Sequence, residues 1–490
     1  MKLRCVPVAL FFSFLVFPRV LVADNYKIEW ADTLDNGDWD GAFSVAVDNS
    51  NNIIVAGISY IGGNNDYFIV RYDSNGTVLW QDTIDNGAAD NAECVAVDNS
   101  NNIIMTGYSS IGGDYDYFII KYDSTGTILW QAALDNNGLY DIARGVAVDN
   151  ANNIIVTGYC DIGNDCVYLT VKYDSDGTIV WADTLSNGLW DSALGVAVDN
   201  ANNIIVTGYT SDGVNNDYFT VKYDSSGTIL WQDIIDKYQF DQAYGVAVDN
   251  SNNIIVTGCS GGPFSDYDYF TLKYDSSGII LWQDTLDNNN NDDVAYSVAV
   301  NNTNNIIVAG YSAAMGGDYD YFVVEYDSSG TILWQGTLDN GDDDIAHGVA
   351  VDNDNNIIVT GKSYIGGNFD YLTVKYAPVT GVSEDEYSKV FSDNAIFCDI
   401  YPNPCSEKTE IKLQFQGNSR QQSVVSAKIH DVAGRVIKDF SQLFSGISHP
   451  SSVVIWNGDD QQGHLVPAGV YFLCFVTSNK SITKKIVKLE

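Results

Sequence analysis

Basic residues, proline and histidine are scarce in this chain of 490 residues. It has 24 Lys+Arg against 64 Asp+Glu, a net charge of -40, so no nucleic-acid partner is expected, because phosphate binding needs a basic surface. With only 8 Pro but 43 Gly, the composition favours short strands joined by tight turns. Of the 4 histidines, only His347 lies before residue 389. Zinc sites built from histidine clusters and histidine-based triads are therefore excluded from that part of the chain.

Long apolar runs are also missing, except at the N-terminus. Lys2 and Arg4 precede an apolar run over residues 6–17, and a short segment then ends at Ala23. This order predicts a signal peptide over residues 1–23, and so an exported protein at the cell surface or in the extracellular medium. Arg19 lies too close to the run for a membrane span of about 20 residues, which makes an uncleaved anchor the weaker alternative.

The acidity is confined to one part of the chain. Residues 24–388 hold 10 Lys+Arg and 55 Asp+Glu, whereas residues 389–490 hold 11 and 9. Adaptation to high salt would acidify both parts. The difference favours a local role such as solubility, cation binding or ligand choice.

Seven of the 8 cysteines remain after removal of a signal peptide, so at least one stays unpaired in an oxidising compartment. Cys160 and Cys166 could bridge one hairpin, and Cys398 and Cys405 could bracket a Pro-Asn-Pro turn. The other three occupy strand positions that suit a small buried apolar residue: Cys94, Cys259 and Cys474.

Internal repetition is the dominant signal. A tryptophan recurs every 50 to 52 residues. Each repeat holds four short apolar segments separated by Asn, Asp and Gly turns, for example residues 195–198, 204–209, 218–223 and 228–231. Four strands per repeat without helical spacing predict the blade of a β-propeller in an all-β protein. The recurring tryptophans, expected to be core residues, are Trp30, Trp80, Trp130, Trp181, Trp231, Trp282 and Trp334.

The two ends of the repeat region complement each other. The seventh repeat stops at Tyr376, before its fourth strand, and residues 26–30 look like a fourth strand without the first three. We expect this N-terminal strand to pair with residues 371–376 and to close a seven-bladed β-propeller over residues 24–376. The repeats resemble a family of seven-bladed propeller repeats in exported bacterial proteins, through Val-Asp-Asn-x-Asn-Asn-Ile-Ile-Val-Thr-Gly and Lys-Tyr-Asp-Ser-x-Gly-Thr-Ile-Leu-Trp. That resemblance implies a fold and little about activity.

Residues 377–397 break the repeat and are predicted to be a linker. Residues 398–490 form a separate all-β domain, which carries Tyr-Pro-Asn-Pro, Asp-Val-Ala-Gly-Arg-Val, Trp-Asn-Gly and Pro-Ala-Gly-Val-Tyr-Phe in order. This motif set resembles the C-terminal sorting domains of the type IX secretion system, which implies the export machinery as a partner. His430, where the family often has an aromatic residue, and the added Cys398, Cys405 and Cys474 depart from the pattern. Without the resemblance, the segment is an immunoglobulin-like sandwich of unknown role.

One aspartate recurs in every repeat, two residues before an alanine. A residue required in all repeats is expected to close a turn or to bond to the next repeat, because a catalytic site is asymmetric. This ring of aspartates is Asp40, Asp90, Asp141, Asp191, Asp241, Asp293 and Asp344.

Variation among the repeats indicates where the ring has more than a structural role. The first strand of each repeat begins with Phe43, Glu93, Arg144, Leu194, Tyr244, Tyr296 or His347, which share no packing requirement. If the first strand lines the axis, these side chains surround one mouth of the central channel. Aromatic loop residues precede the ring aspartate (Trp39, Tyr140, Trp190, Phe240) or the third strand (Tyr115, Tyr267, Tyr319, Phe369). The predicted ligand-binding residues are Glu93, Arg144, Tyr244, Tyr296, His347, Trp39, Tyr140, Trp190 and Phe240; packing and rim filling are the alternative.

The loop over residues 35–40 partly resembles a calcium-binding loop. Asn36, Asp38 and Asp40 imitate the start of an EF-hand loop, but the position of its bidentate glutamate is Val47. That match fails, so no metal or other cofactor is predicted, and a looser site of carboxylates and carbonyls remains the alternative.

Three functions remain open. The first is a surface binding or adhesion module for glycans, in which aromatic rings stack on sugars and Asp and Asn bond to hydroxyls. The second is a protein-interaction platform on the same face. The third is a polysaccharide-active hydrolase or lyase, for which Glu93 and Asp90 are the first candidates. Binding by a monomeric propeller is favoured, because no catalytic residue set is recognisable.

Overall fold

The structure is a computed structural model, and it describes two parts of the chain. The first part is residues 25–379 apart from 111–112, 136–138, 164, 263–265, 289–290 and 314–316. The second is residues 396–489 apart from 402–407, 416–423, 432–434, 442–450 and 478–480. The predicted signal peptide and most of the predicted linker lie outside these residues. The chain divides into two compact units at residues 380 and 381, here called the N-terminal and C-terminal units.

Strands make up almost all of the described structure. In these two parts of the chain, no helix has the length and apolar character needed to cross a membrane. The all-β, propeller-like architecture predicted from the repeat is therefore confirmed.

The N-terminal unit contains β1 to β28, arranged in five four-stranded sheets and one eight-stranded sheet. The eight-stranded sheet is two four-stranded arrangements joined by a single parallel pairing of Asn216 with Phe240. The strands are β1 Tyr26–Leu34, β2 Asp40–Val47, β3 Ile53–Ile61, β4 Asn64–Tyr72, β5 Val78–Ile84, β6 Asp90–Val97, β7 Ile103–Ser110, β8 Tyr115–Tyr122, β9 Ile128–Leu134, β10 Asp141–Val148, β11 Ile154–Asp161, β12 Cys166–Tyr173, β13 Ile179–Leu185, β14 Ser192–Val198, β15 Ile204–Ser211, β16 Asn216–Tyr223, β17 Ile229–Ile235, β18 Phe240–Val248, β19 Ile254–Gly261, β20 Tyr267–Tyr274, β21 Ile280–Leu286, β22 Asp293–Val300, β23 Ile306–Ala313, β24 Tyr319–Tyr326, β25 Ile332–Leu338, β26 Asp344–Val351, β27 Ile357–Ile365 and β28 Asn368–Pro378.

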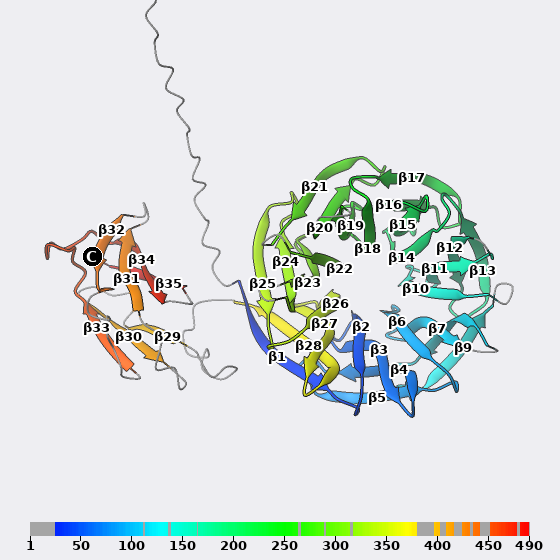
Figure 1. Cartoon of the computed structure of the whole chain (residues 1–490), viewed down its shortest axis with the longest axis horizontal. Coiled ribbons are helices and arrows are strands. Elements are labelled where there is room, and N and C mark those ends of the chain that lie inside the picture. Colours follow the sequence, from blue (N-terminus) through cyan, green and yellow to red (C-terminus); the bar gives the residue numbers. More distant parts are fainter. Residues whose placement is uncertain are drawn as a thin grey trace, which may run out of the picture. The chain divides into compact units, whose positions relative to one another are not determined.

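The first strands of the repeats lie towards the middle of the ring that Figure 1 shows, and the fourth strands lie at its rim. Each first strand contacts the first strands of both neighbouring repeats, in the order β2, β6, β10, β14, β18, β22, β26 and back to β2. The second and third strands are almost wholly buried, as in β3 and β19. Their continuous apolar runs are explained by this burial, because neighbouring repeats cover both faces.

The N-terminal strand completes the sheet of the last repeat. β1 pairs antiparallel with β28, and Ile28 lies opposite Tyr376, as the complementary ends predict. β28 runs to Pro378, two residues beyond the predicted end of the propeller, because Lys27 and Tyr26 pair with Ala377 and Pro378.

The recurring tryptophans join neighbouring repeats at the rim. Trp231 Nε1 donates a hydrogen bond to the carbonyl of Ser276 in the next repeat at 3.3 Å, and its ring covers Gly278 of the same turn. Five others make the equivalent bond: Trp30, Trp80, Trp130, Trp181 and Trp282. These six side chains are half-buried, so the expectation of core residues fits only Trp334, which is 7% exposed.

In all repeats but the sixth, a buried ion pair links the end of the first strand to the third strand. Its basic residue lies near the turn of the next repeat that the tryptophan also contacts. Lys222 Nζ lies 2.9 Å from an Asp199 carboxylate oxygen and donates to the Ser276 carbonyl at 3.1 Å. In the last repeat, β28 continues to Pro378, and the turn that would face the sixth repeat is missing. The sixth repeat differs at both positions of the ion pair, with Asn301 for the aspartate and Glu325 for the lysine. Glu325 instead accepts hydrogen bonds from Tyr26 Oη at 3.2 Å and Asn305 Nδ2 at 2.9 Å.

The C-terminal unit holds two sheets, with strand orders β29-β30-β33 and β32-β31-β34-β35. Its core includes Trp456, which is fully buried, donates to the Asp459 carbonyl at 2.8 Å and packs against Tyr471. The strands are β29 Ile396–Tyr401, β30 Thr409–Phe415, β31 Val424–Asp431, β32 Val436–Asp439, β33 Ser451–Trp456, β34 Gly469–Thr477 and β35 Ser481–Lys488.

One of the two suggested disulfides is wrong. Cys160 lies opposite Val167 and Cys166 opposite Asp161, so the two sulfurs point to opposite faces of the hairpin and no bridge joins them. Cys259 is buried, as expected, whereas Cys94 is only half-buried. Cys405, and with it the second suggested bridge, lies outside the described residues, as does the side chain of Cys474.

Candidate functional site

A cavity of about 980 Å³ opens where the first strands of the repeats meet. All seven variable positions of the first strands line it: Phe43, Glu93, Arg144, Leu194, Tyr244, Tyr296 and His347. In every repeat this residue is a β-bulge, because the pairing with the second strand skips it, as between Ala143 and Gly145. A bulged residue has no partner in the ladder, which leaves its side chain free to vary.

Small residues follow each bulge because the next repeat is close. A Cβ added to Gly195 would lie 2.9 Å from the carbonyl oxygen of Tyr244, and one on Gly348 would lie 3.1 Å from Ser44 Cα. Where serine occupies this position, it bonds to the neighbouring repeat, and Ser44 Oγ accepts from Val95 N at 3.1 Å. The backbone behind the cavity is therefore tightly packed.

Aromatic rings form one side of the cavity. Phe43 contacts His347 edge-on at 5.3 Å between ring centroids, His347 contacts Tyr296 at 4.9 Å, and Tyr296 contacts Tyr244 at 5.0 Å. We call these four side chains the aromatic arc. Burial, with a smaller contribution from the charge of Lys362, lowers the pKa of His347 to about 3. The histidine is therefore a neutral ring at physiological pH.

A charged pair forms the opposite side. Arg144 lies 2.7 Å from a Glu93 carboxylate oxygen, and the side chains are 32% and 14% exposed. Burial lowers the pKa of Arg144, but the charge and hydrogen bond of Glu93, together with Tyr159 and Tyr108, raise it overall. Both side chains line the cavity, and each compensates the charge of the other.

The predicted loop aromatics divide into two groups. Trp190 and Phe240 line the cavity, whereas Trp39 and Tyr140 are not among its lining residues. Trp39 packs against Phe369, and the Lys362 ammonium lies over both rings. Tyr140 packs against Tyr115, 5.4 Å between centroids.

Sequence reasoning missed several lining residues on the second strand. Tyr108, Tyr159 and Tyr209 line the cavity from the position directly after the buried glycine of that strand. Variation among the repeats could have identified this position, as it identified the first-strand position. In the other repeats it holds Ile58, Cys259, Tyr311 and Lys362. Asn91 and Gln242, directly after the ring aspartate, were missed as well.

The ring aspartates are fully buried at the start of the first strands. Asp241 accepts hydrogen bonds from Lys237 N at 2.7 Å, Tyr238 N at 2.8 Å and Ser260 Oγ at 2.5 Å. Asp191 accepts from Asn187 N at 2.6 Å and Gly188 N at 3.0 Å. These bonds hold the loop that enters each repeat, and Asp191 alone of the seven lines the cavity.

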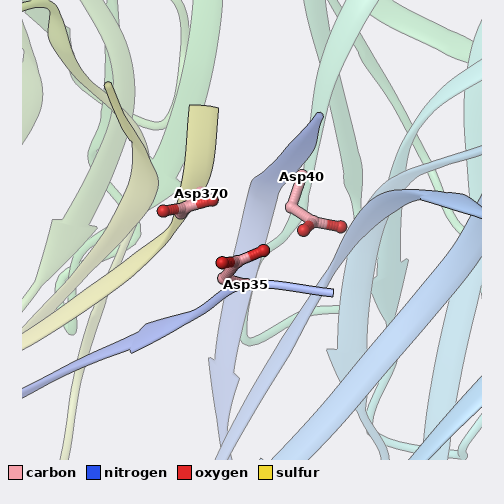
Figure 2. Close-up of side chains that lie close together, drawn as sticks. All are labelled: Asp35, Asp40 and Asp370. Atoms are coloured by element: carbon pink, nitrogen blue, oxygen red, sulfur yellow. The ribbon is translucent and has the colours of Figure 1, made fainter. Parts of the chain in front are cut away.

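Carboxylates also gather in threes between repeats. Asp35, Asp40 and Asp370 present oxygens that lie within 4.8 Å of one another, and Figure 2 shows them on three different segments. Among the described residues, such groups provide the carboxylate oxygens that a divalent cation prefers as ligands.

Two families match parts of the chain. Residues 399–489 match the secretion system C-terminal sorting domain, and residues 49–78 match a β-propeller domain of unknown function, DUF5122. No curated protein is similar enough in sequence to match this chain.

Solved structures of similar fold include PorZ of Porphyromonas gingivalis, an essential bacterial surface component of the type-IX secretion system. It is 15% identical, with a TM-score of 0.47, and the match covers 93% of this chain and 60% of PorZ. This chain thus spans about 60% of that protein's length. Sqt1 from Chaetomium thermophilum matches at 11% identity and TM-score 0.44, over 94% of this chain and 99% of Sqt1. The polysaccharide lyase Uly1 matches at 9% and 0.43, over 70% and 91%.

The family match over residues 399–489 covers the motifs that suggested a sorting domain. A sorting domain of this kind directs export to the cell surface or the extracellular medium. The chain is therefore an exported protein in which a β-propeller body precedes a C-terminal sorting domain of the type IX secretion system.

Proposed function

We propose that the N-terminal unit is a seven-bladed β-propeller that binds a glycan in its cavity, and that the immunoglobulin-like C-terminal unit delivers it to the cell surface. The observation that carries the binding role is the convergence of all seven variable bulge positions on one cavity. A purely structural ring gives no reason for these seven positions to differ in charge and size.

The chemistry of the lining suits sugars. The aromatic arc presents ring faces and edges for C–H groups, and Glu93, Arg144 and Gln242 offer acceptors and donors for hydroxyls. The volume of about 980 Å³ is at the upper end of ordinary ligand cavities of about 300–1,000 Å³ and would admit an oligosaccharide.

Two matched tryptophan and tyrosine variants test the cavity. Trp190 and Tyr140 are loop aromatics before a ring aspartate, 55% and 51% exposed, and only Trp190 lines the cavity. After a screen of immobilised neutral and acidic polysaccharides, Trp190→Ala should weaken binding to the retained glycan by about tenfold, the loss expected for one good contact of about 1.4 kcal/mol. Tyr140→Ala should leave it unchanged. Equal effects, or none, would remove the cavity from consideration.

A protein-interaction platform on the same face is the second candidate, because exposed aromatic and arginine side chains are frequent interface anchors. Trp190 and Tyr238, both about half exposed, lie in successive loops on this side. If pull-down recovers a protein partner and the polysaccharide screen is negative, this function replaces glycan binding.

A polysaccharide-active enzyme is less well supported by the geometry. Asp90 is fully buried and accepts hydrogen bonds from Ser109 Oγ and Asn86 N, so it does not reach the cavity beside Glu93. Incubation with each retained polysaccharide and assay for new reducing ends or unsaturated products tests this alternative directly.

Export through residues 398–490 has its own test. A chain that ends at residue 397 should retain the folded propeller, because the two units are separately compact, but should fail to appear on the cell surface. Protease accessibility on intact cells measures display, and normal display of the shortened chain would contradict the sorting role.

A further inference from the structure

The groups of three aspartates recur at the boundaries between repeats. In the common plan, one aspartate comes from the third strand of one repeat, one from the loop that leaves that repeat, and one is the ring aspartate of the next. Four groups follow this plan, and in a fifth Asp266 takes the place of the ring aspartate. Five of the groups in the described residues are Asp35/Asp40/Asp370, Asp66/Asp85/Asp90, Asp116/Asp135/Asp141, Asp217/Asp236/Asp241 and Asp266/Asp268/Asp287.

Four third-strand aspartates carry a buried oxygen without a hydrogen-bond donor among the described residues: Asp116, Asp217, Asp320 and Asp370. Asp370 and Asp116 are each only 4% exposed, and Oδ1 of each has no partner in the structure. Figure 2 shows Asp370 beside Asp35 and Asp40, two further carboxylates. A buried acceptor that faces other carboxylates is unfavourable unless a proton or a cation lies between them.

Electrostatics agrees with this geometry. Burial, followed by the charges of Asp35 and Asp40, raises the pKa of Asp370 to about 6. Burial and the charges of Asp85 and Asp90 do the same for Asp66. At neutral pH most of these carboxyl groups are nevertheless ionised, so the negative charges remain close together.

One boundary lacks the group and shows which residues belong to it. Between the third and fourth repeats, Val167 replaces the third-strand aspartate and Ser186 replaces the loop aspartate. The ring residue Asp191 is retained, since it holds its loop through the Asn187 and Gly188 amides. Both other carboxylates are replaced together, as expected if the third-strand and loop aspartates serve a shared ligand, and Asp165 is the carboxylate that remains near Asp191.

We propose that these inter-repeat aspartate triads bind calcium ions. Oxygens within 4.8 Å of one another fit around one Ca²⁺, whose oxygen ligands lie at about 2.3–2.6 Å and so up to about 5 Å apart. Mg²⁺ requires about 2.0–2.1 Å and a tighter octahedron. An exported protein meets calcium at the concentrations that sites with a Kd of about 0.1–1 mM need.

The test uses the full chain and a double variant of two triads. Asp66→Asn with Asp370→Asn removes one carboxylate from each, and Asp176→Asn with Asp342→Asn removes the same charge from exposed positions outside the five triads named above. Thermal unfolding is followed at pH 7.5 in EDTA, in 5 mM CaCl₂ and in 5 mM MgCl₂ at equal ionic strength. Equilibrium dialysis with radioactive calcium counts the bound ions.

The expected results separate a ligand role from a structural one. In EDTA the triad variant should unfold at or above the wild-type temperature, because repulsion is removed. In calcium the wild type should gain about 3 °C or more and bind two more ions than the triad variant, whereas the control pair should match the wild type. Magnesium should give a smaller gain.

A complementary variant adds a site. Val167→Asp with Ser186→Asp completes the missing triad with Asp191 and should bind one further ion. The proposal is overturned if calcium leaves the unfolding temperature of the wild type unchanged, or if the triad variant keeps the full number of ions. A protein that is stabilised only by acidification would show that protons occupy these groups instead.

Discussion

The pairing of β1 with β28 joins the two ends of the N-terminal unit, and we call this junction and its contacts with Glu325 the seam. A quantitative prediction can be made for Glu325. This side chain is 4% exposed and accepts hydrogen bonds from Tyr26 and Asn305, where the other repeats have a lysine or arginine. Glu325→Lys would lose two hydrogen bonds to a charged group, each worth about 1.5–3 kcal/mol, and would bury an ammonium beside the neutral Asn301. We expect a loss of about 3–5 kcal/mol of unfolding free energy, the usual result of an uncompensated buried charge.

The partner substitution should restore most of this loss. Asn301→Asp alone places a second carboxylate beside Glu325 and should also destabilise, by about 2–4 kcal/mol. In the double variant the two residues recreate the pair of the ordinary repeats, such as Lys222 with Asp199 at 2.9 Å. The coupling free energy should therefore be favourable by about 4–8 kcal/mol, which is the sum of the two single losses less the deficit that remains. A deficit of about 1 kcal/mol should remain, because no turn carbonyl follows to accept from the lysine.

Urea unfolding monitored by tryptophan fluorescence measures all four proteins, and the C-terminal unit is identical in each. The matched control is the reverse exchange in an ordinary repeat, Asp199→Asn with Lys222→Glu. It should show little recovery, because the Ser276 carbonyl that accepts from Lys222 at 3.1 Å would face a carboxylate. Additive effects of Glu325→Lys and Asn301→Asp, or a neutral Glu325→Lys, would refute the reasoning.

Two further predictions concern the turns and the pH dependence of stability. Gly278→Ala should cost about 1–3 kcal/mol in urea unfolding, because φ is 90° and the new Cβ would lie 2.9 Å from Trp231, whereas Gly62→Ala, with φ 72° and open space around it, should cost about 1 kcal/mol. Without calcium, the melting temperature should be highest near pH 4–5. Below that, it should fall because ion-paired carboxylates with lowered pKa lose their contribution as they are protonated: Asp48, Asp98, Asp149, Asp199 and Asp249. Above it, stability should fall as pH rises through about 6, because folding disfavours the charged form of Asp66, Asp116, Asp217, Asp268 and Asp370. A scan of melting temperature from pH 3 to 8 in EDTA checks both limbs, and a flat profile would contradict them.

Much of the fold could be predicted from local signals. Each turn after the first strand places an asparagine at positive φ, such as Asn202 at 62°, and each turn after the third strand does the same with a glycine, such as Gly227 at 89°. These residues fix where strands end, because their backbone conformation is rare for other side chains. The seam had a readable signal too, since Asn301 and Glu325 depart together from the repeat.

Only part of the candidate site could be predicted from local signals in the sequence. Variation marked the first-strand positions, but the bulge that turns Arg144 and Tyr296 into the cavity depends on the pairing with the second strand. The tyrosines of the second strand vary at a similar level and were missed, because nothing local shows which face of a buried strand meets the axis. Trp39 and Tyr140 have the same sequence position as Trp190 but lie outside the cavity lining.

By itself, the sequence determined the repeat, its strands and turns, the complementary ends and the sorting domain, because each depends on residues close together in the chain or on a recognisable motif. Tertiary structure decided what the repeats enclose and what lies between them. Asp35 and Asp370 are far apart in sequence, and only closure of β1 onto β28 brings them beside Asp40. The aromatic arc likewise joins residues from four repeats, through contacts that exist only when the ring is formed.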